Sequence, residues 1–369
     1  SIVPVRLTYI SVDDYKTKKF NFILTIDELK DFFYKSIDDY TRWHQTLSEA
    51  STVKLDTLKD ITFPFANKRQ GQSELMKATY LTMKANSILY AIAPTGIGKT
   101  MATIFSTLKS MTKPNEKLFY LTAKTIGREV AIDSFRMLQN EGLKLHAIVI
   151  SSKAKSCASK MQHCDPEKCS FAKGYFSRLR QAIEDIYTNE ILYNQETIMK
   201  YALKYNICPF EYSLDLSYFC DAIICDYNYV FDPKAHLIRY FEDTEYQPKI
   251  LCDESHNLVE RSKDMYSAEF DSLLPLRIEE KISSYDKTIT KNIRHFYDEL
   301  KKYDDLVNKD LFYYSHLLDD LMLSSLKQIV QKAELVLADN KEIKDRDEIL
   351  TDYFLLKDFV DTAEFFGQS

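Results

Sequence analysis

One stretch of the sequence, residues 93–100 (APTGIGKT), has the residue types of a loop that binds phosphate. Glycines at 96 and 98 would let backbone amides turn toward phosphate oxygens. A lysine at 99 would reach the β- and γ-phosphates, and the hydroxyl at 100 would bind magnesium. A structural turn is the alternative, but an apolar run precedes the loop and a helical pattern follows it. The nucleotide-binding candidates here are Thr95, Gly96, Gly98, Lys99 and Thr100.

A second candidate, Asp253 and Glu254 in the sequence DESH, ends another apolar run. In enzymes that transfer phosphoryl groups from ATP, one acid at a strand end holds magnesium and a neighbouring acid orients or activates the attacking water. Asp253 fits the first role and Glu254 the second. By itself the tetrapeptide could be a surface turn with two acids. Together with the phosphate loop it indicates two halves of one hydrolytic mechanism, in which Lys99 and Glu254 are catalytic.

Four of the seven cysteines fall in one part of the chain, separated by six, four and thirty-eight residues: Cys157, Cys164, Cys169 and Cys208. An odd total in a long chain favours thiols or metal ligands over a disulfide framework. Four thiolates suit an iron–sulfur cluster or zinc equally well, and His163 could replace one cysteine around zinc. A lobe without metal is the third possibility. The other cysteines lie in or beside apolar runs and are expected in the core.

The same part of the chain is basic, with seven Lys and Arg residues against two acids between residues 151 and 180. The basic residues are Lys153, Lys155, Lys160, Lys168, Lys173, Arg178 and Arg180. Phe171, Tyr175 and Phe176 are interleaved with them, as a groove that stacks the bases of a single strand would require. A solvated basic helix is the alternative reading. The pattern predicts a path for nucleic acid.

The elements that must position these residues alternate between short apolar runs and helical stretches. The runs lie at 87–93, 117–123, 145–150, 221–227 and 249–254 and are expected to be buried parallel strands. This order predicts an α/β fold with a RecA-like parallel sheet, whose ligands bind at the carboxyl ends of the strands. The sheet domain is assigned to 61–150 and 217–264, with 151–216 as an inserted cysteine lobe lacking strand rhythm.

Two further regions flank this domain. Residues 1–60 read as a β-hairpin and a helix capped by Thr25 and Glu28, too small a core for an independent domain. Residues 265–369 carry apolar side chains at helical spacing and are expected to form a helical domain.

The composition argues against membrane proteins, secreted proteins and proteins that coat nucleic acid. No apolar stretch approaches the roughly 18 residues of a membrane span, and the first residues lack the pattern of a signal peptide, so a cytoplasmic protein is expected. A net charge of −6 argues against a protein that coats nucleic acid over its whole surface. A local basic path is compatible with that total.

Together the motifs resemble the XPD/DinG family of superfamily 2 DNA helicases, over about residues 60–369. The segment 63–72 is similar to the family's adenine-side segment, with Gln72 as the base contact. LTAKT at 121–125 resembles its motif for the DNA backbone. DYNYVFDP at 226–233 resembles a further signature, to which the residues alone assign no role.

The resemblance implies a [4Fe–4S] cluster on the four cysteines, with ATP, Mg²⁺, single-stranded DNA and DNA junctions as ligands. It also implies 5′-to-3′ translocation and a place in DNA repair. The helical region is similar to the family's Arch domain, and the opening hairpin and helix resemble the linker behind the nuclease-like domain of some bacterial members. No second motor domain with its arginine finger is recognisable, so a fragment that hydrolyses ATP negligibly is expected. A non-hydrolysing ATP-binding regulator and an RNA motor are the alternatives.

Overall fold

The central part of the chain is built on a five-stranded parallel sheet. The computed structural model describes residues 2–12, 15–159, 164, 168–242, 245–307, 312–316, 319–339 and 343–366. The sheet order is β5-β4-β6-β3-β7, and all four ladders are parallel. The strands are β3 (Glu116–Leu121), β4 (Ala147–Val149), β5 (Leu192–Tyr193), β6 (Ala222–Cys225) and β7 (Gln247–Cys252). Four of the five predicted strands are therefore confirmed, together with the α/β class.

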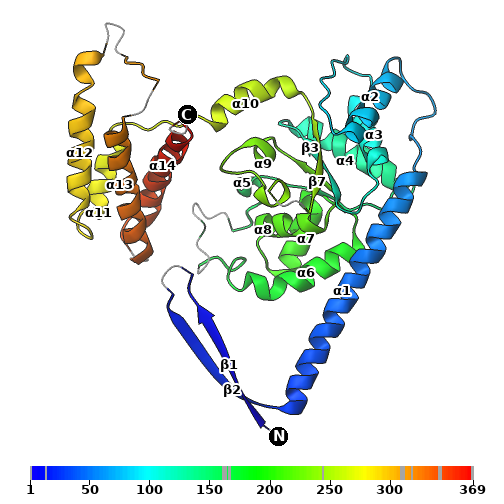
Figure 1. Ribbon diagram of the computed structural model, residues 1–369, viewed down its shortest axis with the longest axis horizontal. Coiled ribbons are helices and arrows are strands. Elements are labelled where there is room, and N and C mark those ends of the chain that lie inside the picture. Colours follow the sequence, from blue (N-terminus) through cyan, green and yellow to red (C-terminus); the bar gives the residue numbers. More distant parts are fainter. Residues whose placement is uncertain are drawn as a thin grey trace.

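Helices cover both faces of this sheet (Figure 1). Alternate residues of β3 point to opposite sides, so Leu118 and Tyr120 pack in one core and Phe119 and Leu121 in the other. The first core is completed by the end of α1 (Ile26–Asp60), α3 (Lys99–Ser110) and α4 (Thr125–Asn140). The second is completed mainly by α6 (Tyr175–Asn189), α7 (Gln195–Tyr205) and α8 (Pro209–Leu216). The other elements are α2 (Gln72–Ala85), α5 (Lys153–Ser156), α9 (Asn228–Phe231), α10 (Leu258–Met265) and the 3₁₀ turns at 217–219, 238–240, 255–257 and 304–306.

The strand predicted at 87–93 is wrong. This segment is irregular, and Ile88, Tyr90 and Ile92 are 82%, 86% and 105% exposed. Its residues have strand composition, but a strand forms only when a neighbour supplies its ladder. In the described part of the chain the sheet ends at β7, and no ladder continues to 87–93.

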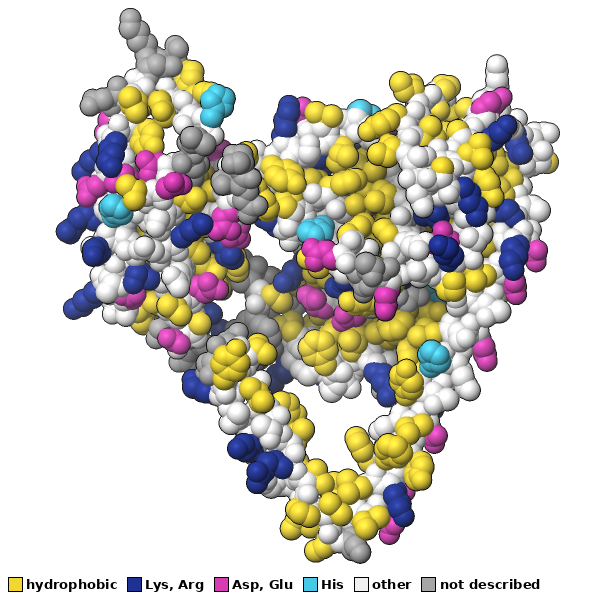
Figure 2. All heavy atoms as spheres, viewed as in Figure 1, with side chains coloured by type: hydrophobic (Ala, Val, Ile, Leu, Met, Phe, Trp, Pro, Cys, Tyr) yellow, Lys and Arg dark blue, Asp and Glu magenta, His cyan; other side chains and the backbone are white. Residues whose placement is uncertain are grey.

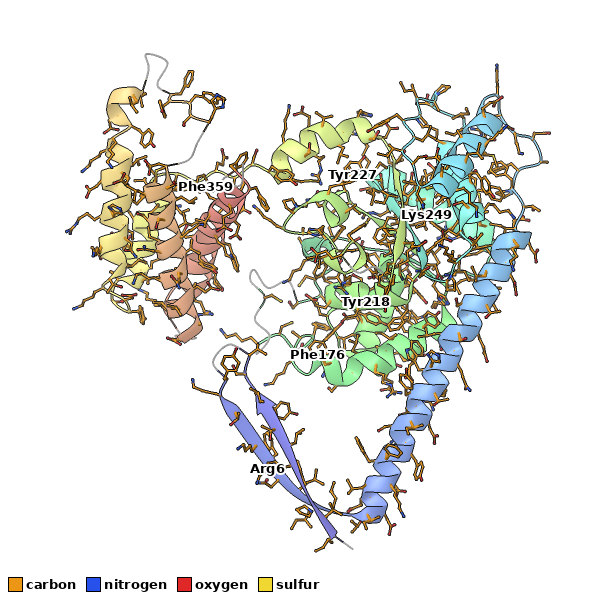
Figure 3. All side chains as sticks on the ribbon, viewed as in Figure 1. Arg6, Phe176, Tyr218, Tyr227, Lys249 and Phe359 are labelled. Atoms are coloured by element: carbon orange, nitrogen blue, oxygen red, sulfur yellow. The ribbon has the colours of Figure 1, made fainter. Side chains whose placement is uncertain are left out.

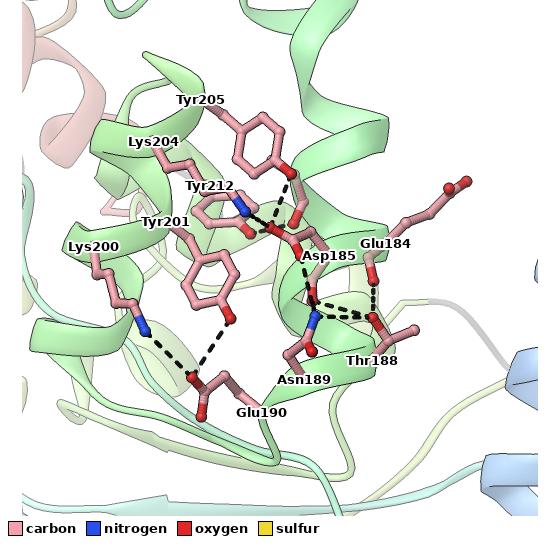
Figure 4. Close-up of polar contacts among 11 residues, drawn as sticks. Glu184, Asp185, Thr188, Asn189, Glu190, Lys200, Tyr201, Lys204, Tyr205 and Tyr212 are labelled. Atoms are coloured by element: carbon pink, nitrogen blue, oxygen red, sulfur yellow. Dashed lines mark hydrogen bonds and ion pairs between the residues drawn. The ribbon is translucent and has the colours of Figure 1, made fainter.

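The helices of the predicted cysteine lobe share the core of the sheet. Leu192 and Tyr193 pair with β4, so the expected lack of strand structure in this lobe is wrong at β5. Helices α6 and α7 are joined by Asp185, whose carboxylate accepts from Lys204 at 2.6 Å and from Tyr205 at 2.8 Å (Figure 4). The lobe therefore has a rigid base on one face of the sheet.

The first 60 residues form the predicted hairpin and helix. Strands β1 (Ile2–Ile10) and β2 (Thr17–Thr25) are antiparallel, and Thr25 and Glu28 make the predicted capping box at the start of α1. Figure 2 shows hydrophobic side chains exposed over the hairpin and the adjoining part of α1. The later part of α1 is attached to the body, because the Trp43 ring packs 5.3 Å from the Phe219 ring.

Residues beyond 265 form a helical bundle with its own core, as predicted. Its helices are α11 (Leu274–Ile282), α12 (Ile289–Lys301), α13 (Asp320–Asp339) and α14 (Arg346–Glu364). The bundle lies beside the α/β body, and α10 leads to it (Figure 1). Among the helices described, none is both long and apolar enough to cross a bilayer.

Candidate nucleotide site and cysteine lobe

The phosphate loop joins the exposed segment at 87–93 to α3. Gly96 and Gly98 have φ values of 84° and 79°, in the left-handed region that favours glycine. A Cβ on Gly96 would meet no atom within 4 Å, so the space beside this glycine is open. The two glycines therefore have the backbone conformation that a phosphate-binding loop uses.

The first residue of α2, Gln72, supports the phosphate loop. Gln72 is only 3% exposed, and its Nε2 donates to the Ile97 carbonyl at 3.0 Å while its Oε1 accepts from the Arg69 amide at 3.1 Å. The Arg69 guanidinium also donates to the Gly96 carbonyl. A side chain at Gly98 would lie 2.8 Å from Gln72 Nε2. Gln72, predicted as the base contact, thus has both ends of its amide engaged by backbone around the loop.

Lys99 and Glu254 meet across the predicted site. Lys99 Nζ lies 3.7 Å from Glu254 Oε1 and donates to the Ala93 carbonyl at 3.2 Å. Both side chains are partly exposed, so this ion pair contributes little to stability and can be exchanged for contacts with a ligand. The structure therefore brings together two motifs far apart in the sequence.

Asp253 directly follows β7, and its amide continues the ladder by donating to the Leu121 carbonyl at 2.9 Å. Thr100 lies near Asp253, because both residues interact with Tyr120. The Tyr120 hydroxyl donates to Thr100 Oγ1 at 3.4 Å. Burial and the negative charge of Asp253 raise the pKa of Tyr120. The two predicted magnesium ligands thus adjoin the same tyrosine.

Two residues around the site, Tyr120 and Gly127, were not predicted from the sequence, and a third, Tyr227, lay in the signature 226–233 to which the sequence assigned no role. A Cβ on Gly127, in the first turn of α4, would lie 2.4 Å from Thr122 Oγ1 and 3.1 Å from Asp253 Oδ2. The sequence contained a signal for Gly127, because a glycine lowers helix propensity and its presence in the first turn of a helix indicates close packing. Tyr227 is fully buried, and its hydroxyl donates to the carbonyls of Asp253 and Glu254 (Figure 3).

The segment predicted to contact the DNA backbone is only partly available to a ligand. Thr122 is 3% exposed, and its amide donates to the Cys225 carbonyl at 3.0 Å. Lys124 and Thr125, at the start of α4, are exposed. A phosphate could therefore be reached by the lysine and the helix start, and not by the Thr122 hydroxyl.

The four cysteines of the predicted metal site differ in their surroundings. Cys169 is buried, Cys157 and Cys208 are partly buried, and Cys164 is exposed. The described residues contain no group of three His, Cys, Asp or Glu side chains placed to hold a metal ion. His163 and Lys160 lie outside the described residues. The cysteine ligand set stays a prediction.

Cys208 has the surroundings of a thiolate ligand in one respect. It lies at the N-cap of α8, where Pro209 is the first residue and the backbone amides of Phe210 and Glu211 follow, and its side chain makes no capping hydrogen bond. Burial raises the pKa of the Cys208 thiol, while these two amides act in the opposite direction. Backbone donors to sulfur stabilise a bound thiolate in metal and cluster sites.

Of the predicted stacking rings, Tyr175 is 7% exposed and donates to Asp215 at 2.8 Å, so its assignment to a stacking surface is wrong. It lies in the core because α6 packs against the sheet through this ring. Phe176 is 83% exposed at the edge of the body that faces the hairpin (Figure 3). Phe171 is partly exposed.

The basic residues also divide into two groups. Lys153, Lys155 and Lys173 are exposed. Arg178 donates to the Lys173 and Asn206 carbonyls at 2.7 and 2.8 Å, and Arg180 pairs with Glu184 at 2.8 Å. The lysines, more than the arginines, are therefore available to phosphate groups.

Comparison with known proteins shows to which proteins this chain is similar. Residues 138–273 match the DEAD_2 family model. The chain is 28% identical over 145 residues to the general transcription and DNA repair factor IIH helicase subunit XPD of Dictyostelium discoideum, covering 39% of this chain and 17% of that protein. It is 30% identical over 124 residues to the regulator of telomere elongation helicase 1 homolog of Aedes aegypti, covering 33% of this chain and 11% of that protein.

Two solved structures are also similar. A structure named XPD helicase matches with a TM-score of 0.47 at 18% identity, covering 79% of this chain and 51% of that chain. A truncated XPD matches with a TM-score of 0.44 at 16% identity, covering 77% and 82%. The sequence matches confirm the resemblance to XPD/DinG-type superfamily 2 helicases, and the bacterial DinG-like subtype stays a prediction. The chain spans less than a fifth of the length of either curated relative.

Proposed function

We propose, from the DEAD_2 match and the two helicase relatives, that this chain carries the ATP-binding motor domain of an ATP-dependent DNA helicase. The observation that carries the proposal is the meeting of the phosphate loop and the acidic pair, with Lys99 Nζ 3.7 Å from Glu254 Oε1. Phosphoryl transfer needs two features on one side of the nucleotide. They are a phosphate-binding loop, here with two glycines in the left-handed region, and an acidic residue at a strand end, here after β7, which pairs in parallel with β3.

The chain's own residues then have distinct roles. The amides around Gly96 and Gly98 bind phosphate oxygens, and Lys99 leaves Glu254 and Ala93 to neutralise the β- and γ-phosphates. Thr100 and Asp253 would hold the magnesium, which would neutralise developing charge on the phosphates. Glu254, released from Lys99, orients and activates the attacking water. A binder that only changes shape with nucleotide has no use for that carboxylate.

Single-stranded DNA would pass over the exposed lysines of the cysteine lobe and beside Phe176, because exposed positive charge and an exposed aromatic ring occur together there. Cys157, Cys164, Cys169 and Cys208 would hold a [4Fe–4S] cluster that organises this surface. The same proposal includes translocation from 5′ to 3′ and binding at DNA junctions. It also assigns the helical bundle as the Arch domain and places the domain boundaries at 60, 150, 216 and 264.

The test joins residues 1–369 to a second motor domain of this family. Unwinding of a forked DNA substrate and DNA-stimulated ATP hydrolysis are then measured together. We expect both activities, with Glu254→Gln lowering turnover about 10²- to 10⁴-fold while MgATP still binds. The matched control is Glu260→Gln, an exposed glutamate on α10 whose loss should change neither activity.

Three results would contradict parts of the proposal. Stimulation by RNA and not by DNA would make the protein an RNA motor. MgATP binding without hydrolysis on any nucleic acid would make it a nucleotide-controlled regulator. Movement from 3′ to 5′ would overturn the polarity alone.

A further inference from the structure

The segment 226–234, which contains the signature DYNYVFDP, contacts three separate parts of the molecule. It follows β6, includes α9, and touches the acidic pair, α10 and α14. The residue types of this segment assign it no role.

Tyr227 fixes the backbone of the acidic pair. Its hydroxyl donates to the Asp253 carbonyl and, at 3.2 Å, to the Glu254 carbonyl. The Glu254 carbonyl also accepts from Asn257, through its amide at 3.0 Å and its side chain at 2.9 Å. These donors surround a residue with φ of 53°, a conformation that side-chain-bearing residues adopt only when neighbours impose it.

The residues on either side of Tyr227 hold α10. A single Arg261 nitrogen donates to Asp226 Oδ1 and to Asn228 Oδ1, both at 2.7 Å. Asp226 Oδ1 also accepts from the Asn228 amide at 3.1 Å, so the two acceptors are fixed relative to each other. Helix α10 begins four residues after Glu254 and leads to the helical bundle.

The far end of the segment reaches the bundle directly. Lys234 Nζ donates to Asp358 Oδ1 and to Thr362 Oγ1, both at 2.5 Å, and these two residues lie one turn apart on α14. Between the two ends, Asp232 accepts from Asn228 Nδ2 at 3.4 Å and from the Lys234 amide at 2.8 Å, so polar contacts run along the segment from the nucleotide site to the last helix of the bundle.

We propose that residues 226–234 form a strap that positions the Asp253–Glu254 backbone for magnesium nucleotide and couples this site to the helical bundle. Tyr227 is the positioning residue, acting through the two carbonyls, and Lys234 is the link to α14. The inference rests on the proposed function only in taking MgATP as the ligand. A change in the backbone of the acidic pair then alters the contacts of α10 and α14.

The first test measures MgATP binding to the 369-residue chain by calorimetry, with and without magnesium. Tyr227→Phe removes one hydroxyl and keeps the packing. We expect it to weaken binding about fivefold with Mg²⁺ present and to leave binding in EDTA unchanged, since an ordinary hydrogen bond changes an equilibrium by about that factor. The control is Tyr240→Phe, which is equally buried and loses a 2.7 Å contact with Ser217 away from the loop. Equal MgATP affinities in the two variants would overturn the positioning role.

The second test follows hydrogen exchange of α14 amides as MgATP is added. We expect MgATP to change exchange in the natural chain and in Lys327→Ala, whose partner Glu364 lies within the bundle, and not in Lys234→Ala. Unchanged exchange in the natural chain at saturating MgATP would overturn the coupling. Failure of the proposed function would look different, because MgATP would then bind as well to Lys99→Ala as to the natural chain.

Discussion

Gln72 gives a prediction that separates two roles for one side chain. The resemblance makes Gln72 a contact for the adenine base, whereas the structure shows its amide bridging Ile97 and Arg69 beneath the phosphate loop. The substitution Gln72→Ala removes both hydrogen bonds. If the amide holds the loop, every ligand that carries the triphosphate should bind less well, whatever its base.

The magnitude follows from the two bonds and from burial. Gln72 is 3% exposed and Ile97 is 8% exposed, so the loss of their bond leaves the Ile97 carbonyl with little access to water, whereas Arg69 is exposed and its amide can bond to water instead. A typical buried bond is worth about 1 kcal/mol net, and stranding its partner costs about 1–3 kcal/mol. We expect Gln72→Ala to lower the free energy of unfolding by about 2–4 kcal/mol and to weaken ATP binding about 5- to 30-fold.

The assay is calorimetric titration of the 369-residue chain with MgATP, MgGTP and magnesium tripolyphosphate. The matched control is Gln139→Ala, because the Gln139 amide also makes two hydrogen bonds to backbone, donating to the carbonyls of Leu145 and Ile191 at 3.1 and 3.2 Å, away from the loop. It should lose stability and keep its affinity for all three ligands. A loss confined to MgATP would refute loop support and establish base contact, and no loss in Gln72→Ala would refute both.

Three further predictions concern the lobe and the core. Protein purified without oxygen should be brown, and Cys208→Ser should lose the colour and the iron; colourless protein with stoichiometric zinc would contradict this. Lys153→Ala with Lys155→Ala should weaken single-strand binding equally for all sequences and flatten its salt dependence, and an unchanged salt slope would place the path elsewhere. Burial lowers the pKa of His146 from 6.5 to about 4, so the unfolded chain takes up a proton in this window that the folded chain does not. The free energy of unfolding should therefore fall by about 2–3 kcal/mol more in the natural chain than in His146→Asn between pH 7 and 4.5, and parallel denaturation curves would contradict this.

The sequence predicted the elements whose signals are local. Buried parallel strands are continuous apolar runs, so four were found, and the capping box at Thr25 needs only residues three apart. The acidic pair was placed correctly at the end of β7 and the loop at the start of α3, whereas the strand expected before the loop does not form.

What could not be predicted depends on partners distant in sequence. The run at 87–93 has strand composition, but whether it forms a ladder depends on a neighbour that its own residues do not specify. Tyr175 and Phe176 are adjacent aromatic residues, and only the orientation of α6 decides that one is buried and the other exposed. Tyr227 contacts backbone carbonyls, which no residue type at 253 or 254 reveals.

The central claim is that the loop at 93–100 and the acidic pair form one magnesium-nucleotide site. Its most direct test is the affinity of the 369-residue chain for ATP with Mg²⁺ and in EDTA, for the natural sequence, Lys99→Ala and Asp253→Asn. We predict that Lys99→Ala weakens binding under both conditions and that Asp253→Asn weakens it only with Mg²⁺, because one residue contacts phosphate and the other the metal. Equal affinities for all three proteins in Mg²⁺ would contradict the account.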